Sequence, residues 1–194
     1  RTIIDINTKI PSRSRHYLYN EESPIPSMIE SCIKLENYPV DFIAIPCNSA
    51  SYYLSSVQSS VRIPIINIME VTVKELVQNF PAVKRVAVFG GVITYECKVY
   101  ESLLKDSGIS YVHHSQQLQK KIEEIIERIK LNESGYKIAN DFRQLVSELQ
   151  VAKNIEAIIL GCTEFGCLQK LNLNIPIIDS SSALARYVIS ISNV

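Results

Sequence analysis

The stretch "DFIAIPCNSA", residues 41–50, is an apolar run that ends in a cysteine followed by small and polar side chains. A run of this kind is typical of a strand that is covered on both faces in a parallel sheet. A second stretch, "EAIILGCTEF" at 156–165, has the same form. Cys47 and Cys162 are therefore both predicted at the carboxyl end of a buried strand, where open α/β sheets bind their ligands.

The two stretches belong to a longer internal repeat. After each cysteine turn we expect a helix and then a second strand, which begins "IPIIN" at Ile63 and "IPIID" at Ile175. The interval from cysteine to proline is 17 residues in the first copy (47 to 64) and 14 in the second (162 to 176). Two related α/β halves would explain this repeat.

Strand-like and helix-like runs alternate along the rest of the chain, which predicts a doubly wound α/β fold with parallel sheets. We expect strands at 2–6, 40–46, 63–68, 84–90, 109–113, 155–161 and 175–178. We expect helices ending near residue 37 and at 50–60, 70–80, 94–108, 116–131, 137–153, 163–171 and 180–192. Residues 11–26 contain three prolines and are expected to be largely loop.

The composition narrows the class of protein. The 194 residues carry 20 basic and 20 acidic side chains and no net charge, so we expect neither a nucleic-acid nor a membrane partner. The five cysteines are odd in number and irregularly spaced, which argues against a disulfide framework and favours the cytoplasm. No second Cys or His pair accompanies Cys162 and Cys167, so no metal site is expected. We also find no dinucleotide fingerprint.

A thiol at a helix N-terminus can act as an acid or a base. The free backbone N–H groups there lower a thiol's pKa from its usual value of about 8.5, and they can also hold a carboxylate. One thiolate and one thiol on opposite sides of a shared site would suit the inversion of a stereocentre that carries an acidic C–H. A lone cysteine at a strand end is more often a packing residue. The repeated context favours the functional interpretation for Cys47 and Cys162, whereas Cys32, Cys97 and Cys167 keep the packing interpretation.

"IPCNSA" at 45–50 and "GCTE" at 161–164 resemble motifs of the aspartate/glutamate racemase family, in particular its aspartate racemase-like branch. "IPSRS" at 10–14, "IPIIN" and "IPIIDSSSALA" support the resemblance. It implies two pseudo-symmetric Rossmann-like domains with the active site in the cleft between them. The first domain would comprise 1–74 plus 179–194, and the second 75–178. Family members open with a strand and a "GGMGP"-type loop, so we expect the N-terminal strand of the first domain to be missing here.

The resemblance implies a racemase that interconverts L- and D-aspartate or glutamate without a cofactor. Cys47 and Cys162 would be the two acid/base groups, and the substrate would be a small acidic amino acid. Homodimers are common in this family, so a homodimer is one assembly that the resemblance allows. The residues that would bind the substrate are Arg13, Asn48, Ser49, Thr94, Lys130, Thr163 and Glu164.

Several alternatives stay open from the residues alone. Arg13 could be a loop arginine in water, Lys130 could complement a helix dipole, and Thr94 could cap a helix. Asn48 and Ser49 could likewise cap the helix after the first cysteine. The chain could be another isomerase or a decarboxylase of the same superfamily. It could also be a degenerate, non-catalytic paralogue that binds an acidic ligand.

Overall fold

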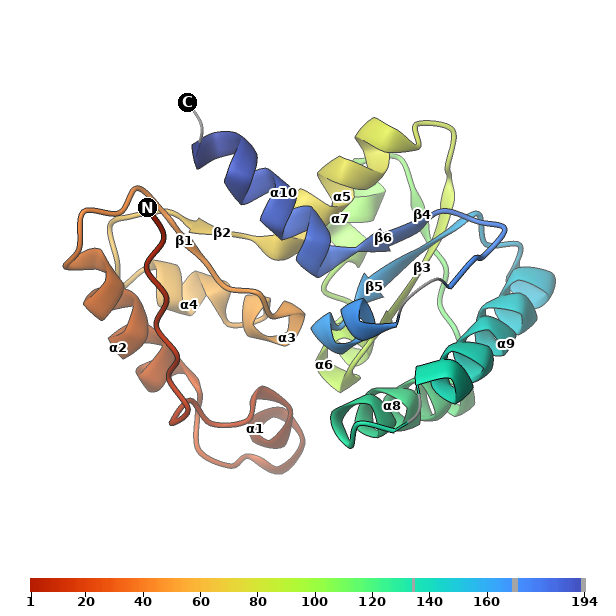
Figure 1. Cartoon of the computed structure of the whole chain (residues 1–194), viewed down its shortest axis with the longest axis horizontal. Coiled ribbons are helices and arrows are strands. Elements are labelled where there is room, and N and C mark those ends of the chain that lie inside the picture. Colours follow the sequence, from red (N-terminus) through yellow and green to blue (C-terminus); the bar gives the residue numbers. More distant parts are fainter. Residues whose placement is uncertain (134, 169–170, 193–194) are drawn as a thin grey trace.

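Two parallel sheets lie side by side in the computed structural model, which describes residues 1–133, 135–168 and 171–192 (Figure 1). The smaller sheet pairs β1 (Ile43–Ala44) with β2 (Ile65–Ile66). The larger sheet has the strand order β4-β3-β5-β6. Its strands are β3 (Arg85–Gly90), β4 (Ser110–Tyr111), β5 (Ala157–Gly161) and β6 (Ile177–Asp179). Every strand pair is parallel, which confirms the predicted fold class.

The helices connect and cover these strands. In chain order they are α1 (Arg13–Tyr19), α2 (Ile25–Glu36), α3 (Asn48–Ser51), α4 (Leu54–Gln58), α5 (Ile68–Asn79), α6 (Val92–Glu96), α7 (Glu101–Asp106), α8 (Gln116–Lys130), α9 (Gly135–Lys153), the 3-10 helix η1 (Thr163–Cys167) and α10 (Ser180–Ser192). Among the described helices, α1 alone has no buried residue. No helix in the described ranges is long and apolar enough to cross a membrane.

The larger sheet is buried on both faces. Ala87 and Phe89 of β3 point to one face and pack in a core with residues of α8 and α9. Val86 and Val88 point to the other face and pack in a second core with residues of α5, α7 and α10. This alternation follows from the period of two in a strand. The smaller sheet has its own core with α2 and α4. Each of the two sheets is therefore packed in a hydrophobic core of its own.

The internal repeat is also present in the hydrogen bonds. In the first copy the N–H of Ile43 donates to the carbonyl of Pro64 at 2.9 Å, and in the second the N–H of Ile158 donates to the carbonyl of Pro176 at 3.0 Å. Each cysteine follows four residues after the donor. The Asn67 and Asp179 side chains, three residues past each proline, accept from a backbone N–H two residues on. The two copies therefore share backbone register as well as sequence pattern.

The predicted strand at 2–6 is wrong. These residues form an irregular segment beside α2, held by an ion pair between Asp5 and Lys34 and by a 2.9 Å hydrogen bond from Asn7 to Ser31. Ile4 and Ile6 remain exposed. Alternating apolar residues resemble a strand in sequence, but side-chain contacts with a helix hold this segment.

Other element boundaries also differ from prediction. Residues 11–26 are not all loop, because the Ser12 hydroxyl accepts from the Arg15 N–H and caps α1. The expected helix at 94–108 is divided into α6 and α7 by Lys98, whose φ of 48° lies in the left-handed region. The expected helix at 50–60 is divided into α3 and α4. The expected helix at 163–171 is a 3-10 helix that ends at Cys167, and residues 169–170 lie outside the described residues.

Phe142 links the core of α9 to the larger sheet, because its ring makes edge-on contacts with Phe89 and Phe165. Replacing it with alanine should lower the free energy of unfolding by about 3–5 kcal/mol, because a buried aromatic ring is lost and a cavity is left. Chemical denaturation followed by circular dichroism measures this change. The control is Val151→Ala on the same helix, at a side chain that is 87% exposed. Equal effects of the two substitutions would contradict the assignment of Phe142 to the core.

Candidate active site

Both cysteines hold the same local position. Cys47 follows β1 and directly precedes α3, and Cys162 follows β5 and directly precedes η1. Each has an extended backbone, with φ and ψ of −154° and 114° at Cys47 and −138° and 130° at Cys162. Both side chains are half-buried. Figure 1 shows α3 and η1 facing each other between the two sheets.

The Cys162 thiol is held in its protonated form. Burial raises the pKa of this thiol, and the hydrogen bond that it donates to Glu164 Oε2 at 2.8 Å raises it further. The negative charge of Glu164 and that of a Cys47 thiolate act in the same direction.

The expectation that a helix N-terminus lowers the pKa of this thiol is wrong for Cys162. The backbone N–H of Glu164 does act to lower it, but burial and the carboxylate outweigh that effect. The helix that follows Cys162 is a 3-10 helix of 5 residues, so few peptide dipoles add up behind the sulfur. The geometry at Cys162 suits a proton donor.

Glu164 is the acceptor in this pair. Burial acts to raise the pKa of its carboxyl, but the Cys162 thiol, a backbone N–H and the charge of Lys130 together lower it. The Thr163 hydroxyl, at 3.4 Å, lowers it as well. Lys130, at the end of α8, is largely exposed and donates to Glu127 at 2.8 Å. Its ammonium group therefore acts on Glu164 through its charge, and the structure gives it no direct contact with either cysteine.

The surroundings of Cys47 have the opposite charge. Arg13 Nη2 donates to the Cys47 sulfur at 3.6 Å. Arg13 is the first residue of α1, and its backbone carbonyl accepts from the hydroxyl of the buried Tyr53 at 3.3 Å. The two cysteines thus differ in their partners: a cation lies beside Cys47 and an anion beside Cys162.

Two of the predicted binding residues are almost completely buried. Asn48 is 2% exposed, and Thr94 is 1% exposed. The Thr94 hydroxyl donates to the carbonyl of Gly161 at 3.4 Å, and its side chain lies where a Cβ on Gly90 or Gly161 would meet it, at 2.7 and 3.2 Å. The two glycines therefore let α6 approach the ends of β3 and β5. Thr94 thus contacts the residue that directly precedes Cys162. A contact between Thr94 and a substrate stays a prediction.

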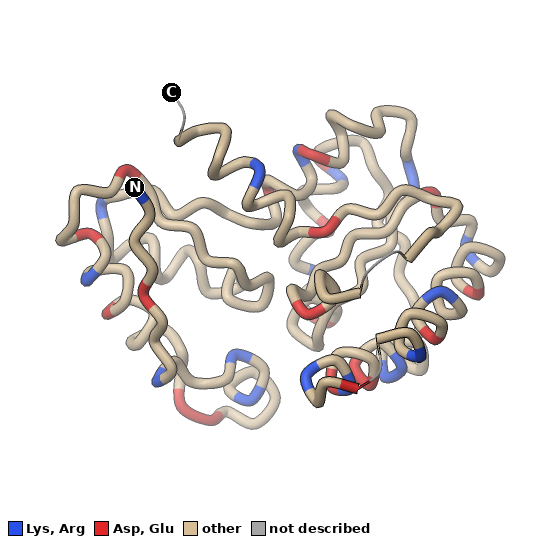
Figure 2. The backbone as a smooth tube through the Cα atoms, in the orientation of Figure 1, with Lys and Arg blue, Asp and Glu red and all other residues tan. Residues whose placement is uncertain are grey.

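Ser49 and Thr163 lie half-buried directly beside the two cysteine turns. They are well placed to contact a molecule between the turns, and their role in binding also stays a prediction. Figure 2 shows charged residues along α8 and α9 and near α1. Within the described ranges, no three His, Cys, Asp or Glu side chains are grouped to hold a metal ion.

Sequence reasoning missed two buried residues that connect the turns, Ser180 and Tyr100. Ser180, the first residue of α10, accepts from Asn48 Nδ2 at 2.9 Å and donates to the carbonyl of Leu160 at 2.7 Å. The Tyr100 hydroxyl donates to Asn48 Oδ1 at 2.5 Å. Ser180 lies in the quoted "IPIIDSSSALA" segment, but no local pattern distinguishes it from its neighbours. Tyr100 lies inside a run that reads as one continuous helix.

Glu164→Gln should lower the pKa of Cys162, because the substitution removes the negative charge that holds its proton. More thiolate is then present at any pH below the pKa, and the profile of alkylation rate against pH moves to lower pH. We expect iodoacetamide to modify Cys162 about tenfold faster or more at fixed pH, since a hydrogen bond to a charged group contributes about 1.5–3 kcal/mol. Peptide mass spectrometry follows the modification. Glu124→Gln, at an exposed position of α8, is the control and should leave the rate unchanged.

Comparison with known proteins places this chain in a family. The model of the Asp/Glu/Hydantoin racemase family matches residues 2–188. The chain is 32% identical over 165 residues to the broad specificity amino-acid racemase RacX of Bacillus subtilis (strain 168), covering 84% of this chain and 70% of that protein. It is 28% identical over 178 residues to a glutamate racemase of Histophilus somni (strain 129Pt), covering 80% of this chain and 61% of that protein.

A solved structure gives the same result for the fold. The aspartate racemase of Picrophilus torridus superposes with a TM-score of 0.78 at 24% identity, covering 96% of this chain and 77% of that one. With the family model matching almost from end to end, the chain belongs to the Asp/Glu/Hydantoin racemase family.

Proposed function

We propose that this protein is a cofactor-independent amino-acid racemase that interconverts the L and D forms of aspartate or glutamate. The observation that carries the proposal is the repeated cysteine turn, with a guanidinium beside one sulfur and a carboxylate beside the other. Family membership supports the reaction class, since the relatives named above are amino-acid racemases. Two cysteines in corresponding turns favour a racemase over a decarboxylase of the same superfamily.

The mechanism uses the two thiols as a base and an acid. The Cys47 thiolate, beside Arg13, removes the α-proton from one face of the substrate, so the Cα–H bond breaks and an S–H bond forms. The Cys162 thiol, which donates to Glu164, gives its proton to the opposite face. The product has the opposite configuration, Cys47 is now a thiol and Cys162 a thiolate. A substrate of the other hand is processed by the same steps in reverse.

Charged groups near the thiols would hold the substrate. Arg13 can bind a carboxylate with two parallel N–H donors, which a lysine cannot do. Lys130 adds positive charge on the side of Cys162, where the charges of Glu164 and Cys162 already act on its amine. Two cations suit an amino acid with two carboxylates. The proposal therefore names acidic amino acids as the substrate class.

Incubation with L-aspartate or L-glutamate in D2O tests the reaction. We expect deuterium at Cα and a loss of optical rotation, because each turnover replaces the α-proton with one from solvent. Nuclear magnetic resonance and polarimetry follow the two changes. Cys47→Ser and Cys162→Ser should each lower kcat by about 10²–10⁴-fold or more, since a serine hydroxyl is a far weaker acid than a thiol. Cys167→Ser, at an exposed position, is the matched control and should keep wild-type activity.

Two outcomes would contradict the racemase. Exchange with no acidic amino acid, together with saturable binding of one, would identify a non-catalytic binding protein. Loss of carbon dioxide from a substrate panel would identify a decarboxylase.

Arg13→Gln should raise KM for the acidic substrate by roughly tenfold or more, because a charge-assisted hydrogen bond is removed. It should also lower kcat, since the Cys47 sulfur loses its hydrogen-bond donor. Steady-state kinetics on both enantiomers separates the two effects. Arg15→Gln is a matched control on the same helix, where the exposed side chain pairs with Glu21. If the two variants had equal KM values, Arg13 would not bind the substrate.

A further inference from the structure

Four buried polar residues from four different segments meet between the two cysteine turns. We call Asn48, Thr72, Tyr100 and Ser180 the polar cluster. Asn48 is 2% exposed and the other three are 0% exposed. Buried polar groups of this kind are hydrogen-bonded to other protein groups, because water does not reach them. Their hydrogen bonds therefore show which segments the cluster holds together.

The hydrogen bonds run from one cysteine turn to the other. Asn48, the neighbour of Cys47 in the chain, donates to Ser180, and Ser180 donates to the carbonyl of Leu160, two residues before Cys162. Each step is shorter than 3 Å, at 2.9 and 2.7 Å. One serine hydroxyl thus connects the smaller sheet's cysteine turn to the strand that carries the other cysteine.

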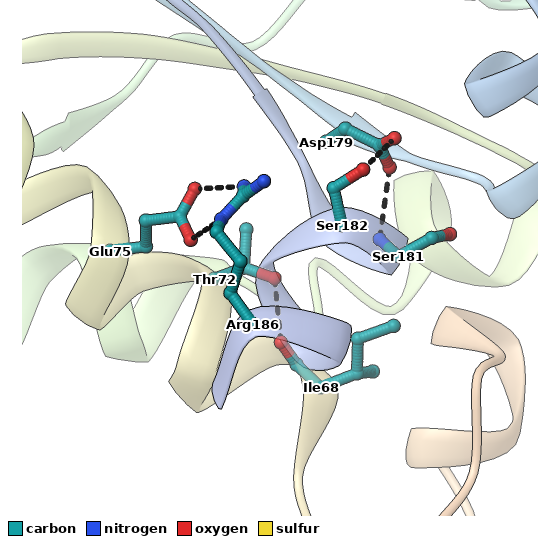
Figure 3. Close-up of polar contacts among 7 residues, drawn as sticks. All are labelled: Ile68, Thr72, Glu75, Asp179, Ser181, Ser182 and Arg186. Carbon is teal, nitrogen blue, oxygen red and sulfur yellow. Dashed lines mark hydrogen bonds and ion pairs between the residues drawn. The ribbon is translucent and has the colours of Figure 1, made fainter. Parts of the chain in front are cut away.

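Tyr100 and Thr72 complete the cluster. The Tyr100 hydroxyl donates to Asn48 Oδ1, so both ends of the Asn48 amide are occupied. Burial raises the pKa of Tyr100, and the neighbouring Thr72 and Ser180 hydroxyls act to lower it. Thr72 is fixed in turn by a 2.6 Å hydrogen bond to the carbonyl of Ile68 one helical turn earlier, which Figure 3 shows. The two hydrogen bonds of the Asn48 amide restrict the rotation of this side chain, which lies at the start of α3.

We propose that Ser180 and Tyr100 are positioning residues that hold the Cys47 turn at a fixed place relative to Cys162, so that a thiol lies on each face of a bound substrate. This inference rests on the proposed function for its catalytic consequence, whereas its geometric content stands without turnover. Neither side chain is exposed to a substrate, since both are 0% exposed.

Fixed spacing affects inversion more than proton removal. One thiolate can remove an α-proton without a correctly placed partner, and its new S–H bond exchanges with solvent deuterium. If the second thiol is displaced, the S–D group returns deuterium to the same face, and the product is labelled but keeps its configuration. The ratio of exchange with retention to inversion therefore reports the relative position of the two thiols and does not depend on the fraction of folded protein.

The first experiment measures this ratio in D2O for the wild type, Ser180→Ala and Tyr100→Phe. We expect kcat for inversion to fall by about 10- to 100-fold in both variants, in keeping with the cost of a small misplacement of a catalytic group, while exchange falls less. The matched control is Ser182→Ala, two residues along α10, whose hydroxyl donates to Asp179 outside the cluster at 2.8 Å (Figure 3). An unchanged ratio in both variants, or a proportional fall in exchange and inversion, would overturn the proposal.

The second experiment needs no turnover. Bis-maleimides of increasing spacer length are used to cross-link Cys47 to Cys162, and peptide mass spectrometry gives the yield for each spacer. We expect one sharp optimum in the wild type and Ser182→Ala, and a broadened optimum in Ser180→Ala and Tyr100→Phe. The same sharp optimum in all four proteins would overturn the proposal. A wild type that shows this sharp optimum without racemising any amino acid would refute the proposed function and leave the positioning role standing.

Discussion

The hydrogen bond from a strand N–H to a proline carbonyl, made once in each half, fixes the register on which both cysteine turns depend. Proline has no N–H, so it fits at the start of a strand, where only its carbonyl is needed. A slip of one residue would turn every side chain of the strand to the other face. Pro64 and Pro176 thereby align Ile43 and Ile158, and each cysteine then follows at the same distance along the chain.

Cys47 and Cys162 hold corresponding positions, but the side chains beside the two sulfur atoms differ in charge. Arg13 comes from a helix near the start of the chain, whereas Glu164 lies two residues after the sulfur that it contacts. The backbone is repeated, but the charges are not. In the proposed mechanism the two thiols take opposite roles in each turnover, and these neighbours are what distinguishes one thiol from the other.

The sequence predicts the features that depend on local pattern. The buried strands, the repeat and the position of each cysteine follow from apolar runs and from the two Ile-Pro-Ile-Ile segments. It does not predict the Asn48–Ser180 contact, because 132 residues separate the two and either side chain could equally serve as a cap. The break at Lys98 has no signal, since lysine rarely adopts a positive φ. The pKa of Cys162 is not predicted either, because it depends on burial and on the direction of the Glu164 carboxylate, which the short 3-10 helix η1 sets.

The guanidinium beside Cys47 is carried by the most weakly anchored helix. Since α1 buries no residue, we expect its local opening to need less free energy than global unfolding. The sheets and the other cysteine turn would be unaffected, because their cores lie elsewhere. Fraying of seven residues would therefore remove the positive charge from one thiol and leave the rest of the molecule folded. We therefore expect temperature or denaturant to lower the fraction of molecules with a folded α1 before the two sheets unfold.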